Sequence, residues 1–167
     1  HRAHASVEAI ARIMPSCAGR LMEEEISKLE SALSSPRKPV MAVVGGAKVS
    51  SKLLLLENLI SPMDKIVIGG GMANTFLAAK GYNIGQSLCE HEMQDTARSI
   101  MENAKKMDCE IILPIDIVVA KEFSTNTNCE TLPSDSCPAD SMILDAGPQT
   151  VKLIHKHLNH TKTVIWN

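Results

Sequence analysis

The fold is decided by residues 40–71, which read VMAVVGGAKVSSKLLLLENLISPMDKIVIGGG. Two apolar runs, residues 40–44 and 65–68, each end abruptly in glycines, and Lys48 and Lys52 precede an apolar-rich segment of helix length between them. This pattern predicts a βαβ unit whose two glycine turns lie at the same edge of a parallel sheet. Ligands of open α/β sheets bind at the carboxyl ends of the strands, so two turns and two cations are expected at a ligand site.

The rest of the chain alternates between helical and strand patterns. Residues 109–120 form an apolar run that Pro114 and Asp116 interrupt, so we expect a strand with an edge, a bulge or a bend at the proline. A polar loop covers residues 122–141, with room for short strands. The alternation predicts an α/β fold with a mainly parallel sheet. Helices are expected at residues 19–34, 72–81, 88–107 and 148–158, and short strands at residues 142–144 and 163–166.

Composition excludes several classes of protein. The 167 residues are 44% hydrophobic and carry a net charge of −2, with no basic stripe, which argues against nucleic acid as the main partner. No apolar run is long enough for a membrane helix, and no signal peptide opens the chain. The five cysteines are odd in number and form no CxxC, so we expect reduced thiols in a cytoplasmic protein. Pairing of Cys129 with Cys137 is the alternative.

The glycine turns suit a nucleotide, because a flat ring or a phosphate can approach a backbone that has no Cβ. If Ser50 caps the next helix, Lys48 and Lys52 both reach the phosphate region. The turns match neither GxxxxGK[ST] nor GxGxxG. A tightly packed α/β crossover with exposed lysines therefore explains this stretch about as well as nucleotide binding does.

Other candidate residues stand elsewhere in the chain. Leu144, in LDAGPQT, can pack on a base, and Asn167, after VIW, suits ribose or phosphate; core packing and turn chemistry are equally good explanations. His155, His157 and His160 cluster near the end, and only the last two have the helical spacing of metal ligands. We expect exposed helix histidines and no metal site there.

Taken together and in order, HRAHAS, GGAKVSSK, KIVIGGGMANTFL, EIILPIDIVVA, LDAGPQT and VIWN closely resemble phosphoglycerate kinase of the bacterial type, over essentially the whole chain. The resemblance implies a two-domain kinase of glycolysis, with a Rossmann-like nucleotide domain that has helices on both faces of its sheet. Residues 1–18 would end the N-terminal substrate domain and form the hinge segment, and residues 19–167 would be a partial nucleotide-binding domain. It implies Mg²⁺ carried by ATP or ADP, 3-phosphoglycerate or 1,3-bisphosphoglycerate as the other substrate, and a monomer.

The resemblance also assigns roles to individual residues. Arg2 corresponds to an arginine that contacts phosphoglycerate, and Lys48 to the catalytic lysine that follows the transferred phosphoryl group. Lys52 and Asn167 correspond to residues near the nucleotide phosphates. The adenine is expected between Gly46–Ala47 and Gly70–Gly71, beside two leucines, Leu88 and Leu144.

The sequence departs from the family pattern in two ways. Ser51 stands where many members carry an acidic residue, so that position offers Lys52 no charge partner. Most of the substrate domain and the glycine-rich loop for the terminal phosphates lie outside these 167 residues, so we expect a fragment that is inactive alone. A non-catalytic adenine-nucleotide-binding fragment is the alternative. A dinucleotide-dependent dehydrogenase is excluded, because GxGxxG and a ribose-reading acid are not found.

Overall fold

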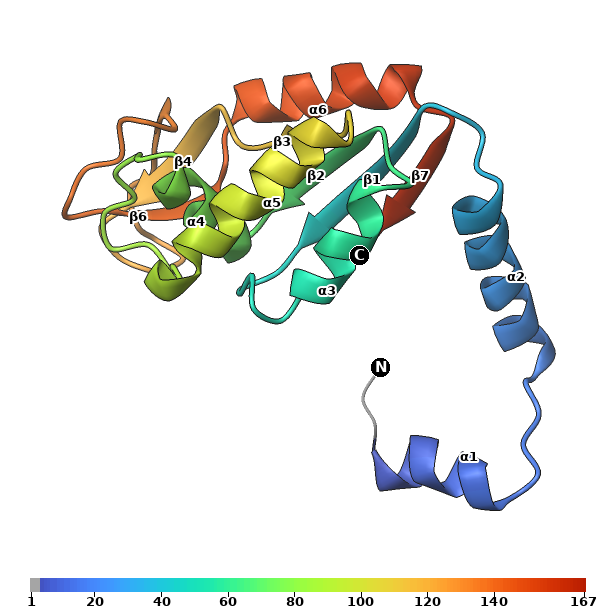
Figure 1. Cartoon of the computed structure of the whole chain (residues 1–167). Coiled ribbons are helices and arrows are strands. Elements are labelled where there is room, and N and C mark those ends of the chain that lie inside the picture. The colour runs from blue at the N-terminus through green and yellow to red at the C-terminus, as the bar shows by residue number, and fades with distance from the viewer. Residues whose placement is uncertain (1–3) are drawn as a thin grey trace. The chain divides into compact units, whose positions relative to one another are not determined.

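A computed structural model describes residues 4–167, and the chain divides into two compact units, residues 1–35 and 36–167 (Figure 1). In the first unit a π-helical turn, Ala5–Ala9, leads into α1 (Ile10–Ile13), and α2 follows at Arg20–Ser34. The helix expected at residues 19–34 is confirmed. Its apolar residues, including Leu21 and Leu29, are exposed within the described residues.

The second unit contains a parallel sheet of four strands in the order β3-β2-β1-β7. Strand β1 pairs with β2 on one side and with β7 on the other. In this register Gly45 lies opposite Gly69, so both glycine turns begin at the same edge, as predicted. The strands are β1 (Val40–Gly45), β2 (Lys65–Gly69), β3 (Glu110–Ile112) and β7 (Thr163–Trp166).

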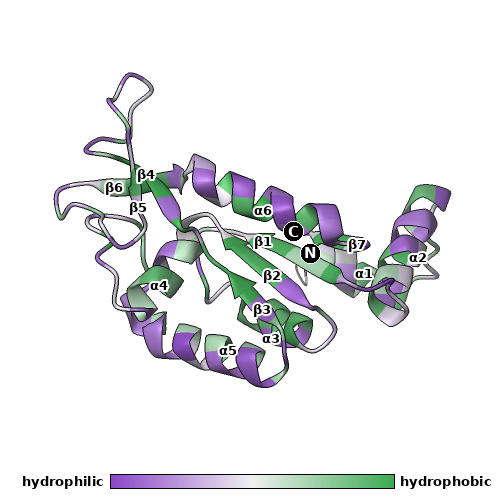
Figure 2. Cartoon of the chain, turned by 90° about the horizontal axis from the view of Figure 1, so that it is seen from above, coloured by the Kyte–Doolittle hydropathy of each residue, from purple (hydrophilic) through white to green (hydrophobic). Residues whose placement is uncertain are grey.

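Helices cover both faces of this sheet, which confirms the predicted α/β class. Figure 2 shows α6 on one side and α3 and α5 on the other. Leu153 and Ile154 of α6 pack on Met41 and Val67, while the larger cluster around Phe76 fills the opposite face. The helices are α3 (Leu53–Ile60), α4 (Gly71–Ala79), α5 (Gln94–Lys106) and α6 (Pro148–His160).

A second, antiparallel sheet has the order β5-β4-β6 and was not foreseen as a separate layer. Its strands are β4 (Asp116–Ala120), β5 (Glu130–Pro133) and β6 (Met142–Ala146). The apolar run at residues 109–120 is therefore two strands in two sheets, β3 and β4, separated at Pro114. A proline cannot donate to a strand ladder, and here the chain leaves one sheet for the other.

One local prediction was wrong, and one condition that the sequence left open is not met. The helix expected from Leu88 begins later, with a 3₁₀ turn at His91–Met93 followed by α5, because Leu88 and Glu90 are held by hydrogen bonds from α4. Ser50 does not cap α3: the helix begins after Lys52 without a side-chain cap, and the Ser50 hydroxyl bonds Glu90 instead.

Two findings concern the chain as a whole. All five cysteines are unbridged, including Cys129 and Cys137. Among the helices of the described residues, none is long and apolar enough to cross a membrane.

Candidate functional site

The two glycine turns touch at the carboxyl edge of the parallel sheet. Gly70 has φ +66°, and a Cβ on it would lie 2.8 Å from the Gly46 carbonyl oxygen. That oxygen accepts a hydrogen bond of 2.8 Å from the Met72 amide. A Cβ on Gly71 would lie 3.2 Å from the Ala47 oxygen. The four predicted residues thus meet through backbone contacts, and we call them together the glycine wall.

The lysine loop, residues 46–52, connects β1 to α3 beside this wall. Lys52 donates a hydrogen bond to Asn167 Oδ1, and its Cε lies 3.8 Å from the Cβ position of Gly46. Asn167 is fixed by its own backbone, because its amide donates to Val43 at 2.9 Å and its oxygen accepts from Gly45 at 3.1 Å. Two segments that are distant in sequence, the lysine loop and the end of β7, therefore bring Lys52, Gly46 and Asn167 together.

Lys48 lies on the exposed part of the lysine loop, next to the fully buried Val49. Within residues 4–167, neither Lys48 nor Lys52 forms an ion pair with a carboxylate. Two cations without carboxylate partners at the ends of parallel strands suit an anionic ligand.

Leu88 reaches the same wall from the segment after α4. Its Cδ2 would lie 2.9 Å from a Cβ on Gly71, and its side chain is 56% exposed. The buried Asn74 donates to the Leu88 carbonyl at 3.1 Å. An apolar side chain thus stands exposed beside the glycine wall, where a base can pack on it.

Leu144 lies at an irregularity of β6, between Ile143, which pairs with Val119, and Asp145, which pairs with Val118. The neighbouring Ile143 amide donates to the Ser87 hydroxyl at 2.8 Å. Since Ser87 precedes Leu88 directly, this hydrogen bond places the Leu144 segment alongside the Leu88 segment.

Glu90 is the residue that sequence reasoning missed. It is buried, and its Oε1 accepts from the Ser50 hydroxyl at 2.5 Å while its Oε2 accepts from the Ser50 amide at 3.0 Å. Burial raises the pKa of Glu90, but hydrogen bonds from Ser50 and Val49 and the charge of Lys48 outweigh it and hold the pKa below its usual value. The sequence placed Glu90 inside a helix and carried no signal of this contact.

Arg2, the predicted phosphoglycerate ligand, lies outside the described residues. Among the residues that the structure describes, no group of three His, Cys, Asp or Glu could hold a metal ion. His157 is half-buried on α6, and burial together with the charge of Lys65 lowers its pKa.

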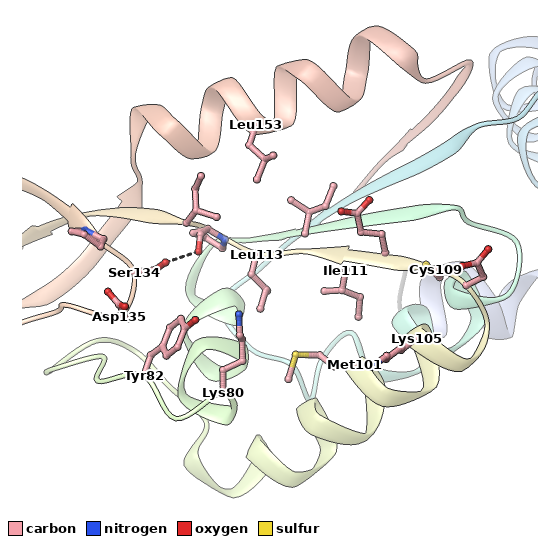
Figure 3. A pocket seen from close by; sticks show the side chains of 16 residues that line it. Lys80, Tyr82, Met101, Lys105, Cys109, Ile111, Leu113, Ser134, Asp135 and Leu153 are labelled. Carbon is pink, nitrogen blue, oxygen red and sulfur yellow. Dashed lines mark hydrogen bonds between the residues drawn. The ribbon is translucent and has the colours of Figure 1, made fainter.

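A pocket of about 720 Å³ lies elsewhere, along the free edge of β3. Figure 3 shows Met101 and Lys105 of α5 at one side of it and Leu153 of α6 at the other. None of the predicted site residues lines this pocket. Its charged residues have both signs, among them Lys80 and Asp135, so it offers no selective anion site.

Comparison with known proteins gives a consistent result. The family model described as phosphoglycerate kinase matches residues 1–167. The chain is 62% identical to a phosphoglycerate kinase of Jannaschia sp. (strain CCS1) and 59% identical to one of Ruegeria sp. (strain TM1040), in each case over all of this chain and 42% of the relative. The chain thus spans less than half the length of these relatives.

Solved structures of the same kind are similar in shape. The phosphoglycerate kinase of Coxiella burnetii matches with a TM-score of 0.87 and 43% identity, over 90% of this chain and 39% of that one. That of Pyrococcus horikoshii OT3 matches with a TM-score of 0.81 and 27% identity, over 100% of this chain and 43% of the other.

Proposed function

Because this chain belongs to the phosphoglycerate kinase family, we propose that it is a partial nucleotide-binding half of an ATP:3-phosphoglycerate phosphotransferase. The glycolytic reaction is 1,3-bisphosphoglycerate plus ADP to 3-phosphoglycerate plus ATP. The observation that carries the proposal is the convergence of Lys52, Asn167 and the touching glycine turns at one sheet edge. Residues 1–18 are assigned to the substrate domain and hinge, and residues 19–167 to the nucleotide domain.

The nucleotide lies along the glycine wall in this proposal. The adenine stacks on the open side of Gly46, Ala47, Gly70 and Gly71, with Leu88 and Leu144 as its apolar neighbours. The contacts of Gly70 with Gly46 and of Gly71 with Ala47 support a binding surface that both turns build together. The phosphates extend toward Lys52 and Asn167, and Arg2 contacts the phosphoglycerate.

The proposed phosphoryl transfer requires positive charge near the transferred group and correct positioning of the two substrates. The acceptor of the phosphoryl group is a carboxylate, which is already ionised at neutral pH because its pKa is about 4. No general base is needed. Lys48, the catalytic residue in this proposal, balances the charge on the oxygens of the phosphoryl group during transfer.

The metal, in this proposal, is Mg²⁺ carried by the nucleotide phosphates. Besides the metal, the phosphate oxygens are bound by hydrogen-bond donors and cations of the chain, namely Lys48, Lys52 and the Asn167 amide. The five unbridged cysteines support a reducing compartment, and we assign the protein to the cytoplasm.

Titration of ADP onto the 167-residue chain tests the proposal, with the single tryptophan as reporter. Trp166 is 78% exposed and precedes Asn167, so bound phosphates should change its fluorescence. We expect saturable binding that Lys52→Ala weakens about tenfold, the loss of one charge-assisted hydrogen bond. Lys162→Ala is the control, because Lys162 is exposed and lies before β7, at the opposite end of that strand.

The outcome separates the two candidate functions. We expect no phosphoryl transfer from the chain alone, because the substrate-binding residues of the other domain lie outside it. Binding of ADP without turnover supports the partial kinase and its non-catalytic alternative alike, and adding the missing part of a relative should restore turnover only for the kinase. A chain that binds no ADP contradicts both.

A further inference from the structure

We propose that Glu90 is a positioning residue, which holds the lysine loop in the conformation that presents Lys48 and Lys52 to nucleotide phosphates. This inference rests on the proposed function and adds a residue that the family resemblance did not assign. Glu90 acts through Ser50, which lies midway between the two lysines in the chain.

The contact between Glu90 and Ser50 uses both oxygens of the carboxylate. Oε1 accepts from the hydroxyl and Oε2 from the amide of the same residue, so the backbone of Ser50 is fixed in direction as well as in place. On one side of Ser50, Val49 is fully buried and anchors the loop in the core. On the other, the Lys52 amide donates to the Val49 carbonyl at 2.9 Å. The conformation of the loop between the two lysines is therefore set by Glu90 and the core together.

The backbone of Glu90 is itself held by α4. The Glu90 amide donates to the hydroxyl of Thr75, which is fully buried, at 3.1 Å. Helix α4 begins at the second glycine turn, and its Met72 amide bonds the Gly46 carbonyl at the start of the lysine loop. The contacts thus form a closed circuit from Gly46 through α4 and Glu90 to Ser50, and back along the loop. A circuit of this kind keeps the loop in one conformation before a ligand arrives, which lowers the ordering cost of binding.

Direct contact between Glu90 and a nucleotide is disfavoured by charge. An ionised carboxylate repels phosphate, and here both oxygens are already occupied by Ser50. The charge of Lys48 is among the influences that favour the ionised form of Glu90. Glu90 therefore acts on the ligand only through the loop.

The test compares ADP with adenosine, because adenosine has the base and ribose but no phosphates. Glu90→Ala and Glu90→Gln are titrated with both ligands by isothermal titration calorimetry, which measures adenosine binding without needing a phosphate near Trp166. Glu92→Gln is the control, since Glu92 is exposed, lies two residues on and loses the same charge. We expect ADP affinity to fall about tenfold in Glu90→Ala and about threefold in Glu90→Gln, with adenosine affinity unchanged. The control should stay within twofold for both ligands.

The possible outcomes separate the two proposals. Equal losses for ADP and adenosine would show a general loosening of the site and overturn the positioning role, as would unchanged ADP affinity. A wild-type chain that binds neither ligand overturns the proposed function itself. If Glu90→Ala does not fold, Glu90→Gln keeps the volume of the side chain and one acceptor, and its ADP-to-adenosine ratio decides the question.

Discussion

Two buried carboxylates in this molecule, Glu90 and Asp116, make the same kind of contact in different places. Each accepts hydrogen bonds from the hydroxyl and the amide of one remote residue, Ser50 for Glu90 and Thr150 for Asp116. Burial raises the pKa of each carboxyl, and in each case the hydrogen bonds outweigh it and lower the pKa. The local chemistry of the two contacts is therefore nearly identical.

The partners of the two carboxylates differ. Asp116 also accepts from the Gln149 amide at 2.8 Å, so it caps the N-terminus of α6, where backbone N–H groups and the helix dipole favour a negative charge. Glu90 bonds a loop that carries two lysines. The same kind of contact therefore completes the architecture at the start of α6 and, under the proposed function, positions the lysine loop for binding at Glu90.

The largest effect on stability is expected from Gly147→Ala, which disturbs the Asp116 contact. A Cβ on Gly147 would lie 2.3 to 2.8 Å from atoms of the Asp116 carboxylate. Displacing this carboxylate leaves the Gln149 amide and the buried donors of Thr150 without their partner, so we expect the free energy of unfolding to fall by about 3 kcal/mol. Urea denaturation followed by far-UV circular dichroism measures the change.

Gly69→Ala is the matched control for Gly147→Ala, because its added Cβ meets no atom within 4 Å. We expect the control to change the free energy of unfolding by less than about 1 kcal/mol. Equal losses in the two variants would mean that Asp116 is not held where the structure places it.

A smaller effect is expected from Asp116→Asn, and it depends on pH. The pKa of Asp116 is lowered in the folded state, so its stabilisation is present above the unfolded pKa of about 4 and is lost as pH falls through the folded pKa. The asparagine variant should therefore be about 2 kcal/mol less stable than wild type at pH 7 and approach it at low pH. Urea midpoints between pH 7 and pH 3 give the curve.

Glu90→Gln sharpens this comparison in the same experiment. The pKa of Glu90 is also lowered, so the sign of the pH dependence is the same. Its carboxylate bonds a loop and no helix end, and we expect a smaller loss of stability together with a loss of ADP affinity, which Asp116→Asn should not show. If both Glu90→Gln and Asp116→Asn lost ADP affinity at pH 7 while still folded, the distinction between a positioning Glu90 and a structural Asp116 would be wrong.

The sequence was sufficient for the parallel sheet and its ligand edge. Apolar runs that stop at glycines mark buried strands and their turns, so β1, β2 and the position of both glycine turns at one edge could be predicted from pattern. The antiparallel sheet could not, because Pro114 indicates a bend or an edge in residues 109–120 but does not show that the chain passes from one sheet to another there.

The Glu90 contact could not be predicted for a related reason. Leu88 and Glu90 have helical spacing with the residues that follow, yet Asn74 and Thr75 hold them outside a helix. Glu90 then meets Ser50 across 40 positions of the chain. Tertiary hydrogen bonds outweigh the local helix propensity of this segment, and such contacts cannot be predicted from a short stretch of sequence.

The smallest effect expected is that of Ser50→Ala, compared with Thr150→Val. The Thr150 hydroxyl bonds the Asp116 carboxylate at 2.6 Å and also accepts from the Ile115 amide at 3.0 Å, so its loss should cost about 2 kcal/mol of stability. The Ser50 hydroxyl donates to Glu90, and in Ser50→Ala the backbone amide of residue 50 still donates to the same carboxylate. The loss of stability should therefore be about 1 kcal/mol or less. Urea denaturation measures both, and ADP titration separates them: Ser50→Ala should weaken ADP binding about threefold, whereas Thr150→Val should leave it unchanged. A larger stability loss in Ser50→Ala than in Thr150→Val would mean that the Glu90–Ser50 contact stabilises the fold more than the Asp116–Thr150 contact does. That outcome would contradict the distinction between a structural Asp116 and a positioning Glu90.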